Sequence, residues 1–180
     1  MNITTRESLV SESGFLEQPP HYWTQSDCEI VLQNHQPGIL YQVAMRIVNR
    51  IHQCASPLCL VVGPVTTGGL GHSEENLKVL AGAIELVRYK GYAVFNQLYF
   101  ELAFKRYVED FREKFGDEKY PSEIITNFYL PLIDNGRFVY CYTIEGWETS
   151  IGARMKYEHF QKTGREIRNI DLLQIRQYLA

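Results

Sequence analysis

The chain has 180 residues, a hydrophobic fraction of 45%, a charged fraction of 22% and a formal net charge of −3 at pH 7. A chain of this length can bury a sizeable core in one domain, and its composition is ordinary for a globular protein. The weakly acidic balance argues against nucleic acid as a partner.

Features that the sequence lacks disfavour further classes of protein. No apolar run approaches the length of about 20 residues that a membrane span needs, and no basic region followed by an apolar stretch opens the chain. We therefore expect no membrane partner and a cytoplasmic location. The cysteines form no CxxC pair and have no His at metal-ligand spacing, so we expect no metal site and no disulfide framework. They are Cys28, Cys54, Cys59 and Cys141.

Residues 1–36 are polar and irregular, with a break at Pro19-Pro20. They predict an N-terminal arm, docked by Tyr22 and Trp23, ahead of a single α/β domain of residues 37–180. The domain opens with a predicted helix over residues 37–53, since Pro37 suits a first helical turn. Apolar residues recur there at helical spacing and give one apolar face. They are Leu40, Val43, Ala44, Ile47, Val48 and Ile51.

The segment LCLVV at residues 58–62 is apolar without alternation, which is typical of a strand covered on both faces. A glycine-rich loop follows. Next comes a predicted helix over residues 73–90, with Ser73 as its expected N-cap and Gly91 just past its end. The segment YAVFN at residues 92–96 predicts a second strand. This order predicts a right-handed unit with parallel strands.

The alternation of helices and strands continues to the end of the chain. Helices are predicted over residues 98–115, 123–133 (interrupted by Pro131), 150–163 and 170–180, and strands over residues 137–144 and 165–167. The predicted fold is therefore an α/β protein with an open parallel sheet. We expect a flavodoxin-like or Rossmann-like three-layer sandwich with an extra N-terminal helical arm.

Two loops follow predicted strands and carry suggestive residues. GPVTTGGLGH, after the first strand, contains four glycines, which allow backbone N–H groups to approach a phosphate or a sugar; the alternative is a flexible connecting turn. No Lys follows the glycines, so a Walker-type triphosphate site is not expected. In EGWETSIGAR, Thr149 or Ser150 caps a helix with Gly152 in its first turn. That arrangement suits an anion, or else an ordinary capped helix packed on the sheet.

The carboxyl ends of parallel strands meet at one edge of a sheet, so we expect both loops to border one crevice. One series of segments within residues 58–167 is distinctive in its order: GPVTTGG, Asn76-Leu77, Ala83-Ile84, Lys90-Gly91-Tyr92, VFNQ and GWETSIGAR, with Gly164 among the residues downstream. This series resembles the nucleoside 2-deoxyribosyltransferase-like family, which includes deoxyribosyltransferases and nucleotide N-glycosidases.

The resemblance implies cleavage or transfer of the N-glycosidic bond of a nucleoside or a (deoxy)nucleoside 5′-monophosphate. A carboxylate attacks the anomeric carbon, and water or another base resolves the glycosyl-enzyme. A small-molecule nucleoside or nucleotide is the implied partner, and a homo-oligomer the implied assembly. No cofactor is expected.

The chain departs from the family at the usual nucleophile, a Glu four residues after the glycine of the GA motif, because Lys156 stands there. Glu158 follows two residues later, rotated by roughly 200° on a helix. Glu101 and Glu148 have plain alternatives as a helix-start charge and a solvated surface charge. Activity as an enzyme is thus open, and the alternative is a catalytically inactive nucleotide-binding module. The candidate catalytic residues are Glu101, Glu148 and Glu158.

Candidate substrate-binding residues come from the two loops, the helix after the second loop and the end of the second strand. Arg154 and Lys156 suit a phosphate, with a salt bridge and simple solvation as their respective alternatives. His72 and Trp147 suit a ligand contact, or a loop and a packing role. The full set is Gly63, Pro64, Thr66, Thr67, Gly68, Gly69, His72, Asn96, Trp147, Ser150, Gly152, Arg154 and Lys156.

Overall fold

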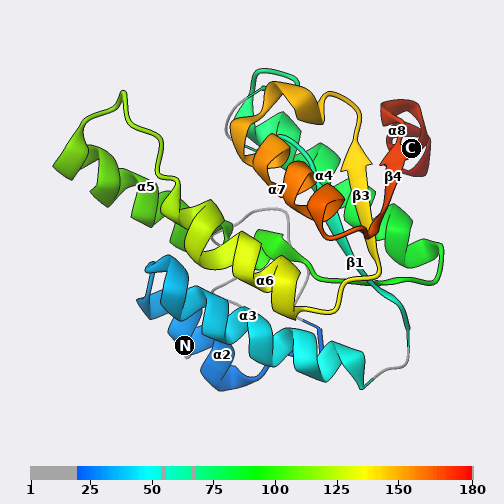
Figure 1. Ribbon diagram of the computed structural model, residues 1–180, viewed down its shortest axis with the longest axis horizontal. Coiled ribbons are helices and arrows are strands. Elements are labelled where there is room, and N and C mark those ends of the chain that lie inside the picture. Colours follow the sequence, from blue (N-terminus) through cyan, green and yellow to red (C-terminus); the bar gives the residue numbers. More distant parts are fainter. Residues whose placement is uncertain (1–19, 54–55, 66–67, 180) are drawn as a thin grey trace, which may run out of the picture. The chain divides into compact units, whose positions relative to one another are not determined.

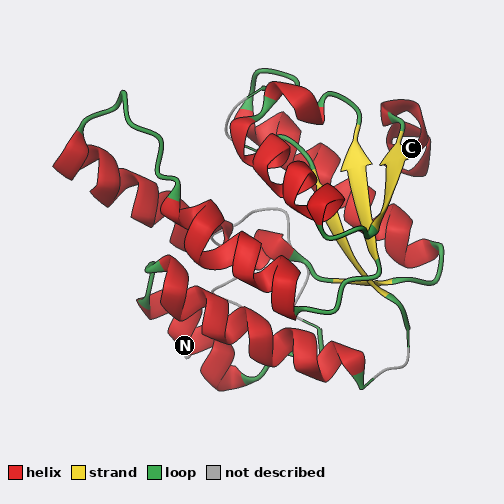
Figure 2. Ribbon diagram, in the orientation of Figure 1, coloured by secondary structure: helices red, strands yellow, loops and turns green. Residues whose placement is uncertain are grey.

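The computed structural model describes residues 20–53, 56–65 and 68–179, and within them four parallel strands form one sheet (Figures 1 and 2). The strands are β1 (Leu58–Val62), β2 (Ala93–Val94), β3 (Tyr140–Ile144) and β4 (Glu166–Ile170), in the order β2-β1-β3-β4. β1 pairs in parallel with both β2 and β3, and β3 with β4. The predicted open parallel α/β sheet is confirmed.

Helices cover both faces of this sheet. α4 (Ser73–Tyr89) packs on β1 and β2 and against α8 (Leu172–Leu179), whereas α7 (Ile151–Lys162) packs on β1, β3 and β4. The chain leaves β1 and β3 in opposite directions along the sheet, so right-handed crossovers place α4 and α7 on opposite faces. Figure 1 shows α7 in front of the sheet and α4 behind it. This three-layer arrangement buries all five residues of β1, as the LCLVV segment predicts.

The chain divides into two compact units. The sheet and its helices form one, from residues 51–96 and 133–180; the other combines residues up to 50 with residues 97–132. The second holds α2 (Gln25–Gln33), most of α3 (Pro37–His52), α5 (Glu101–Phe115) and the start of α6 (Leu130–Asn135). This grouping differs from the expected arm of residues 1–36 followed by one domain, because α2 packs with α3 and α5.

Aromatic side chains build the core of this helical unit. The ring centroids of Trp23 and Phe100 lie 5.4 Å apart, those of Phe100 and Phe128 5.1 Å, and those of Phe104 and Phe128 4.9 Å. Trp23 is fully buried, which agrees with its predicted docking role. Burial of such large rings is a main source of stability in a small core.

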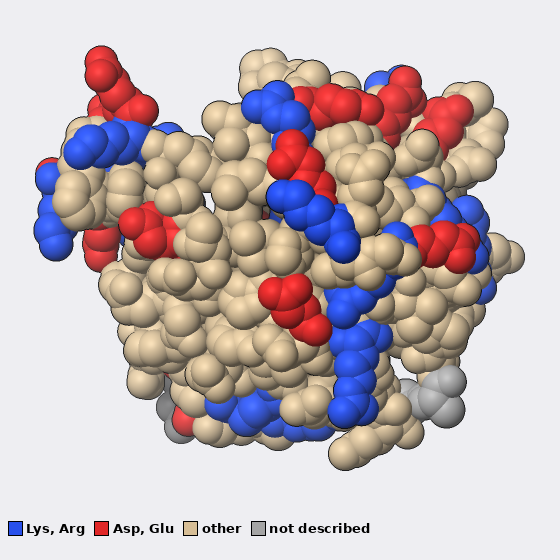
Figure 3. Space-filling model, in the orientation of Figure 1, with Lys and Arg blue, Asp and Glu red and all other residues tan. Residues whose placement is uncertain are grey.

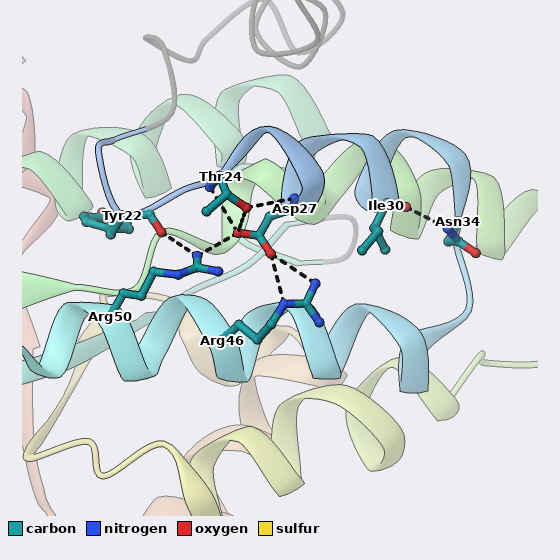
Figure 4. Close-up of polar contacts among 7 residues, drawn as sticks. All are labelled: Tyr22, Thr24, Asp27, Ile30, Asn34, Arg46 and Arg50. Carbon is teal, nitrogen blue, oxygen red and sulfur yellow. Dashed lines mark hydrogen bonds and ion pairs between the residues drawn. The ribbon is translucent and has the colours of Figure 1, made fainter.

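A buried carboxylate joins α2 to α3 (Figure 4). Asp27 accepts hydrogen bonds from the backbone N–H and the hydroxyl of Thr24, at 3.1 and 2.7 Å, in a capping box at the start of α2. It also accepts from Arg46 at 3.1 Å and from Arg50 at 2.6 Å. Burial raises the pKa of Asp27, but the hydrogen bonds from Arg50 and Thr24 outweigh burial and leave the pKa below its ordinary value.

Three local expectations need correction. Ser73 is the first residue of α4, and the cap position belongs to His72, whose side chain makes no capping hydrogen bond. The strand expected over residues 92–96 is only Ala93–Val94, because Gln97–Phe100 winds into a 3-10 turn that leads to α5. Pro131 does not interrupt its helix. A wide π-turn, Ile125–Tyr129, runs into α6 and relieves the clash of the proline ring with the preceding turn.

Candidate functional site

The candidate site lies in the sheet unit, at the carboxyl ends of β1 and β3. These strands are neighbours, and the chain leaves them toward opposite faces, so their loops diverge around a crevice. The loops also touch, because the backbone N–H of Gly69 donates to Thr149 Oγ1 at 2.7 Å. The expectation that the two glycine-containing loops share one edge of the sheet is confirmed.

The glycines of the first loop have a packing reason for being small. Gly68 and Gly69 adopt φ values of 73° and 63°, which side-chain-bearing residues rarely adopt. A Cβ atom on Gly68 would lie 2.6 Å from the carbonyl carbon of Thr149, and one on Gly69 would lie 2.8 Å from Pro64 Cβ. Because these glycines have no side chain, Thr149 can pack closely against Gly68 and Pro64 against Gly69. The Cβ positions give no evidence of close approach by a ligand.

Asn76, a buried residue in the first turn of α4, holds the same loop in shape. Its side-chain N–H₂ donates to the carbonyls of Val65 and Gly68 at 3.2 and 3.1 Å, and its oxygen accepts from the N–H of Leu70 at 3.0 Å. All the side-chain groups of Asn76 that can hydrogen-bond are thus directed at the loop backbone. A side chain of α4, the helix that follows this loop, therefore fixes the conformation of the loop.

The second loop is also held in place by hydrogen bonds and by ring stacking. Thr149 Oγ1 donates to the carbonyl of Gly146 at 2.7 Å, and Ser150 caps α7 by accepting from the N–H of Ala153 at 3.4 Å. Of the two expected caps, Ser150 is confirmed. Trp147 stacks on Tyr157, with centroids 3.9 Å apart and ring planes at 23°. Arg154 Nη1 donates to the carbonyl of Glu148 at 2.8 Å.

Two adjoining cavities open beside these loops and share Glu145 and Gly146. The first, of about 150 Å³, is a mainly apolar slot with Asn76 and Glu145 as its polar side chains. Its apolar walls are Pro64, Leu70, Val79, Ile144 and Leu172. The second, of about 440 Å³, has mixed polar and apolar walls and lies over the ends of β3 and β4. Its lining side chains are Glu145, Trp147, Glu148, Asn169, Ile170, Asp171 and Gln174.

Three carboxylates border the larger cavity, and two of them hold the first turn of α8. Glu145 Oε2 accepts from the N–H of Leu172 at 3.4 Å, and Asp171 Oδ1 accepts from the N–H of Leu173 at 2.7 Å. Glu148 is exposed. Across the described residues, no three side chains of the His, Cys, Asp or Glu types are grouped closely enough to hold a metal ion.

The predicted site residues divide between the crevice and other places. Those that line a cavity are Pro64, Gly69, Trp147 and Glu148. Others belong to the same unit without lining either cavity: Gly63, Gly68, His72, Asn96, Ser150, Gly152, Arg154, Lys156 and Glu158. Glu101 belongs to the helical unit, as the first residue of α5. Thr66 and Thr67 lie outside the described residues.

Lys156 does not behave as a solvated charge. Its side chain is buried, with 4% of the residue exposed, and it faces the sheet closely enough that its charge acts on the pKa of Cys141. Glu158, two residues later, is exposed, in line with the expected rotation of roughly 200° between them. The position of the family's nucleophile thus points into the protein interior, and the nearest acid of α7 points outward.

Reasoning from sequence missed Glu145, Asn169, Asp171 and Gln174. Glu145 comes directly after β3, and Asp171 directly after β4. The first residue after a parallel strand is a general signal for a site at the carboxyl edge, and it would have found Glu145, because the predicted third strand also ends at residue 144. It would not have found Asp171, because the predicted fourth strand ends at residue 167 and β4 ends at residue 170. Asn169 and Gln174 depend on the register of β4 and on the course of α8, which only the folded sheet defines.

None of the helices in the described part of the chain combines the length and the apolar character that a membrane span requires. Comparison with protein-family models, with curated proteins and with solved structures finds no match to this chain.

Proposed function

We propose that the crevice beside β1, β3 and β4 binds a nucleoside or nucleotide and that the chain cleaves or transfers its N-glycosidic bond. The observation that carries the proposal is the pairing of an apolar slot with a carboxylate-lined cavity at the carboxyl ends of these strands. An apolar slot suits a heterocyclic base, and carboxylates suit sugar hydroxyls and the anomeric carbon. The motif resemblance supplies the reaction class.

The chemistry assigned to the crevice needs one carboxylate as a nucleophile, and Glu145 and Glu148 are the candidates. The carboxylate oxygen forms a bond to C1′ of the sugar while the bond from C1′ to the base nitrogen breaks. The electron pair of the broken bond leaves with the base, which gains a proton from a neighbouring acid or from solvent. Water, or a second base, then attacks C1′ and releases the carboxylate.

A second function has its own supporting observation. Lys156, at the family's nucleophile position, is buried against the sheet. A chain that has lost the nucleophile and kept the fold would act as a catalytically inactive nucleotide-binding module. In that case the crevice binds its ligand without turning it over.

A hydrolysis screen separates the two. The purified chain is incubated with ribo- and deoxynucleosides and their 5′-monophosphates, and release of free base is followed by chromatography. We expect release that is lost in Glu145→Gln or Glu148→Gln and kept in Glu85→Gln, an exposed acid farther along α4. Glu101→Gln and Glu158→Gln test the remaining candidate acids.

Each other outcome has one meaning. No release, together with thermal stabilisation by a member of the panel, indicates the binding module. Release that survives both crevice variants contradicts the assignment of the carboxylates. Neither release nor stabilisation contradicts the ligand class.

A further inference from the structure

We propose that the crevice selects an uncharged nucleoside and discriminates against the same nucleoside carrying a 5′-phosphate. This inference rests on the proposed function and narrows its ligand class. It follows from three features of the described residues: the charge that lines the cavities, the places of the nearby cations, and the use already made of the backbone N–H groups.

The charge that lines the cavities is negative. Glu145, Glu148 and Asp171 border the larger cavity, and no Lys or Arg is among the described residues that line either one. In Figure 3 acidic side chains stand along the upper edge of the face shown, with basic side chains beside them. A phosphate monoester carries a charge near −2 at neutral pH, so each carboxylate repels it.

The two cations of α7 that suit a phosphate in the sequence do not line either cavity. Arg154 directs Nη1 at the carbonyl of Glu148, at 2.8 Å, and does not line either cavity. Lys156 is buried on the side of α7 that faces the sheet. Neither side chain is therefore among those placed to give a phosphate in the cavities the bidentate or point-charge contact that such a site commonly uses.

Several backbone N–H groups near the crevice are also occupied. Phosphate loops bind through free N–H groups at a helix N-terminus or in a glycine turn. Here the N–H of Gly69 donates to Thr149, and that of Leu70 to Asn76. The first turn of α8 donates from Leu172 to Glu145 and from Leu173 to Asp171, so two carboxylates already occupy its N-terminus.

At the start of α7, Ser150 Oγ accepts from the N–H of Ala153. At these N–H groups a side-chain oxygen of the protein stands where a phosphate oxygen would otherwise bind. An uncharged sugar meets no such conflict, because its hydroxyls donate hydrogen bonds to carboxylates. The crevice is therefore suited to hydroxyl donors and poorly suited to anions.

The test compares matched ligands. Calorimetric titrations of the whole chain use adenosine, guanosine, cytidine, uridine and thymidine, their deoxy or ribo counterparts, and the 5′-monophosphate of each, at about 50 and 500 mM salt. We expect at least one nucleoside to bind on the order of tenfold more tightly than its monophosphate at low salt, with a smaller ratio at high salt.

Two variants check the cause. Glu148→Gln combined with Asp171→Asn removes two charges, while the Asn keeps an oxygen for the N–H of Leu173. We expect this variant to bind the monophosphate several-fold more tightly than the unaltered chain does. Glu85→Gln is the control, because Glu85 lies far along α4 from the crevice and a helix rises about 1.5 Å per residue. This variant also removes one charge, and it should keep the original ratio of nucleoside to monophosphate affinity.

The outcomes separate this inference from the function beneath it. A monophosphate that binds as tightly as its nucleoside, or more tightly, overturns the selection and leaves the proposed function standing. A preference for the nucleoside that changes neither with salt nor in the double variant overturns the electrostatic cause. Binding of no member of the panel overturns both the selection and the proposed function.

Discussion

Gly69 and Thr149 are 80 residues apart in sequence, and the backbone N–H of the first donates to the hydroxyl oxygen of the second at 2.7 Å. The same hydroxyl donates to the carbonyl of Gly146. One side-chain oxygen therefore fixes the loop after β1 and shapes the turn after β3. Because both loops contribute residues that line the cavities, this contact links two walls of the crevice.

Replacing this hydroxyl gives the first prediction. Thr149→Val keeps the shape of the side chain and removes both hydrogen bonds, so we expect a loss of about 1–2 kcal/mol in the free energy of unfolding, measured by urea denaturation. Thr149→Ser keeps the hydroxyl and should lose less. A loss in Thr149→Ser with none in Thr149→Val would mean that the methyl group, and not the hydroxyl, matters.

A second prediction concerns the close approach of the loops. Gly68→Ala combines an unfavourable φ of 73° with a Cβ atom 2.6 Å from the Thr149 carbonyl carbon, and we expect it to cost about 2–4 kcal/mol. Gly71→Ala is the matched control. Gly71 has a φ of 82° but nothing within 4 Å of its Cβ position, so only the backbone cost of about 1 kcal/mol applies. Similar denaturation midpoints for both variants would contradict the packing argument.

A third prediction follows from the buried carboxylate of the helical unit. Asp27→Asn leaves Arg46 and Arg50 without their charge partner, and we expect a loss of about 3 kcal/mol at pH 7. The folded pKa of Asp27 lies below its unfolded value of about 3.9. The contribution of Asp27 is therefore complete above about pH 4 and disappears as the pH falls through the folded pKa.

Urea denaturation from pH 7 to pH 2 measures this effect, and the gap between the native chain and Asp27→Asn should narrow below about pH 4. Asp117→Asn serves as the control, because this carboxylate is exposed and lies 3.8 Å from Arg112. That variant should change stability by no more than about 0.5 kcal/mol. A gap at Asp27 that stays constant with pH would show that packing, and not charge, accounts for the loss.

A fourth prediction concerns the thiols of the sheet. Burial raises the pKa of Cys59 to about 12, although the nearby charge of Arg168 opposes it. Burial likewise raises the pKa of Cys141 to about 12, with Lys156 opposing. At pH 8 both remain thiols, so iodoacetamide should leave them unmodified in the folded chain and alkylate them in denaturant. Peptide mass spectrometry reads each site, and rapid labelling of Cys59 or Cys141 in the native chain would contradict this burial.

The sequence predicted the sheet unit well where its signals are local. The bounds of β1 agree at both ends, and α4 begins within one residue of the start that an N-cap at Ser73 predicts, because a fully apolar run and a helix flanked by glycines are strong patterns. The helix α2 was missed because its segment is polar. The spacing of Thr24 and Asp27 is a capping-box signal that would have revealed it.

The site was predicted in part for a physical reason. Loops that leave neighbouring strands meet by topology, so the contact between the two glycine-containing loops could be anticipated. Asp171 reaches the crevice through β4, whose pairing with β3 depends on the tertiary register. The orientation of Lys156 depends on which face of α7 is buried, and the sequence around it does not present a clear apolar stripe.

The pairing of β1 with β3 has a consequence for synthesis of the chain. Cys59 pairs with Tyr140, and Val62 with Thr143, so the ribosome adds 80 residues between the two partners of each pair. At a synthesis rate of about 5–20 residues per second, one edge of β1 therefore remains without its partner strand β3 for roughly 4–16 s. An apolar LCLVV strand with an open edge is a template for association with other nascent chains. We therefore expect refolding from urea to be slow, with a yield that falls as protein concentration rises.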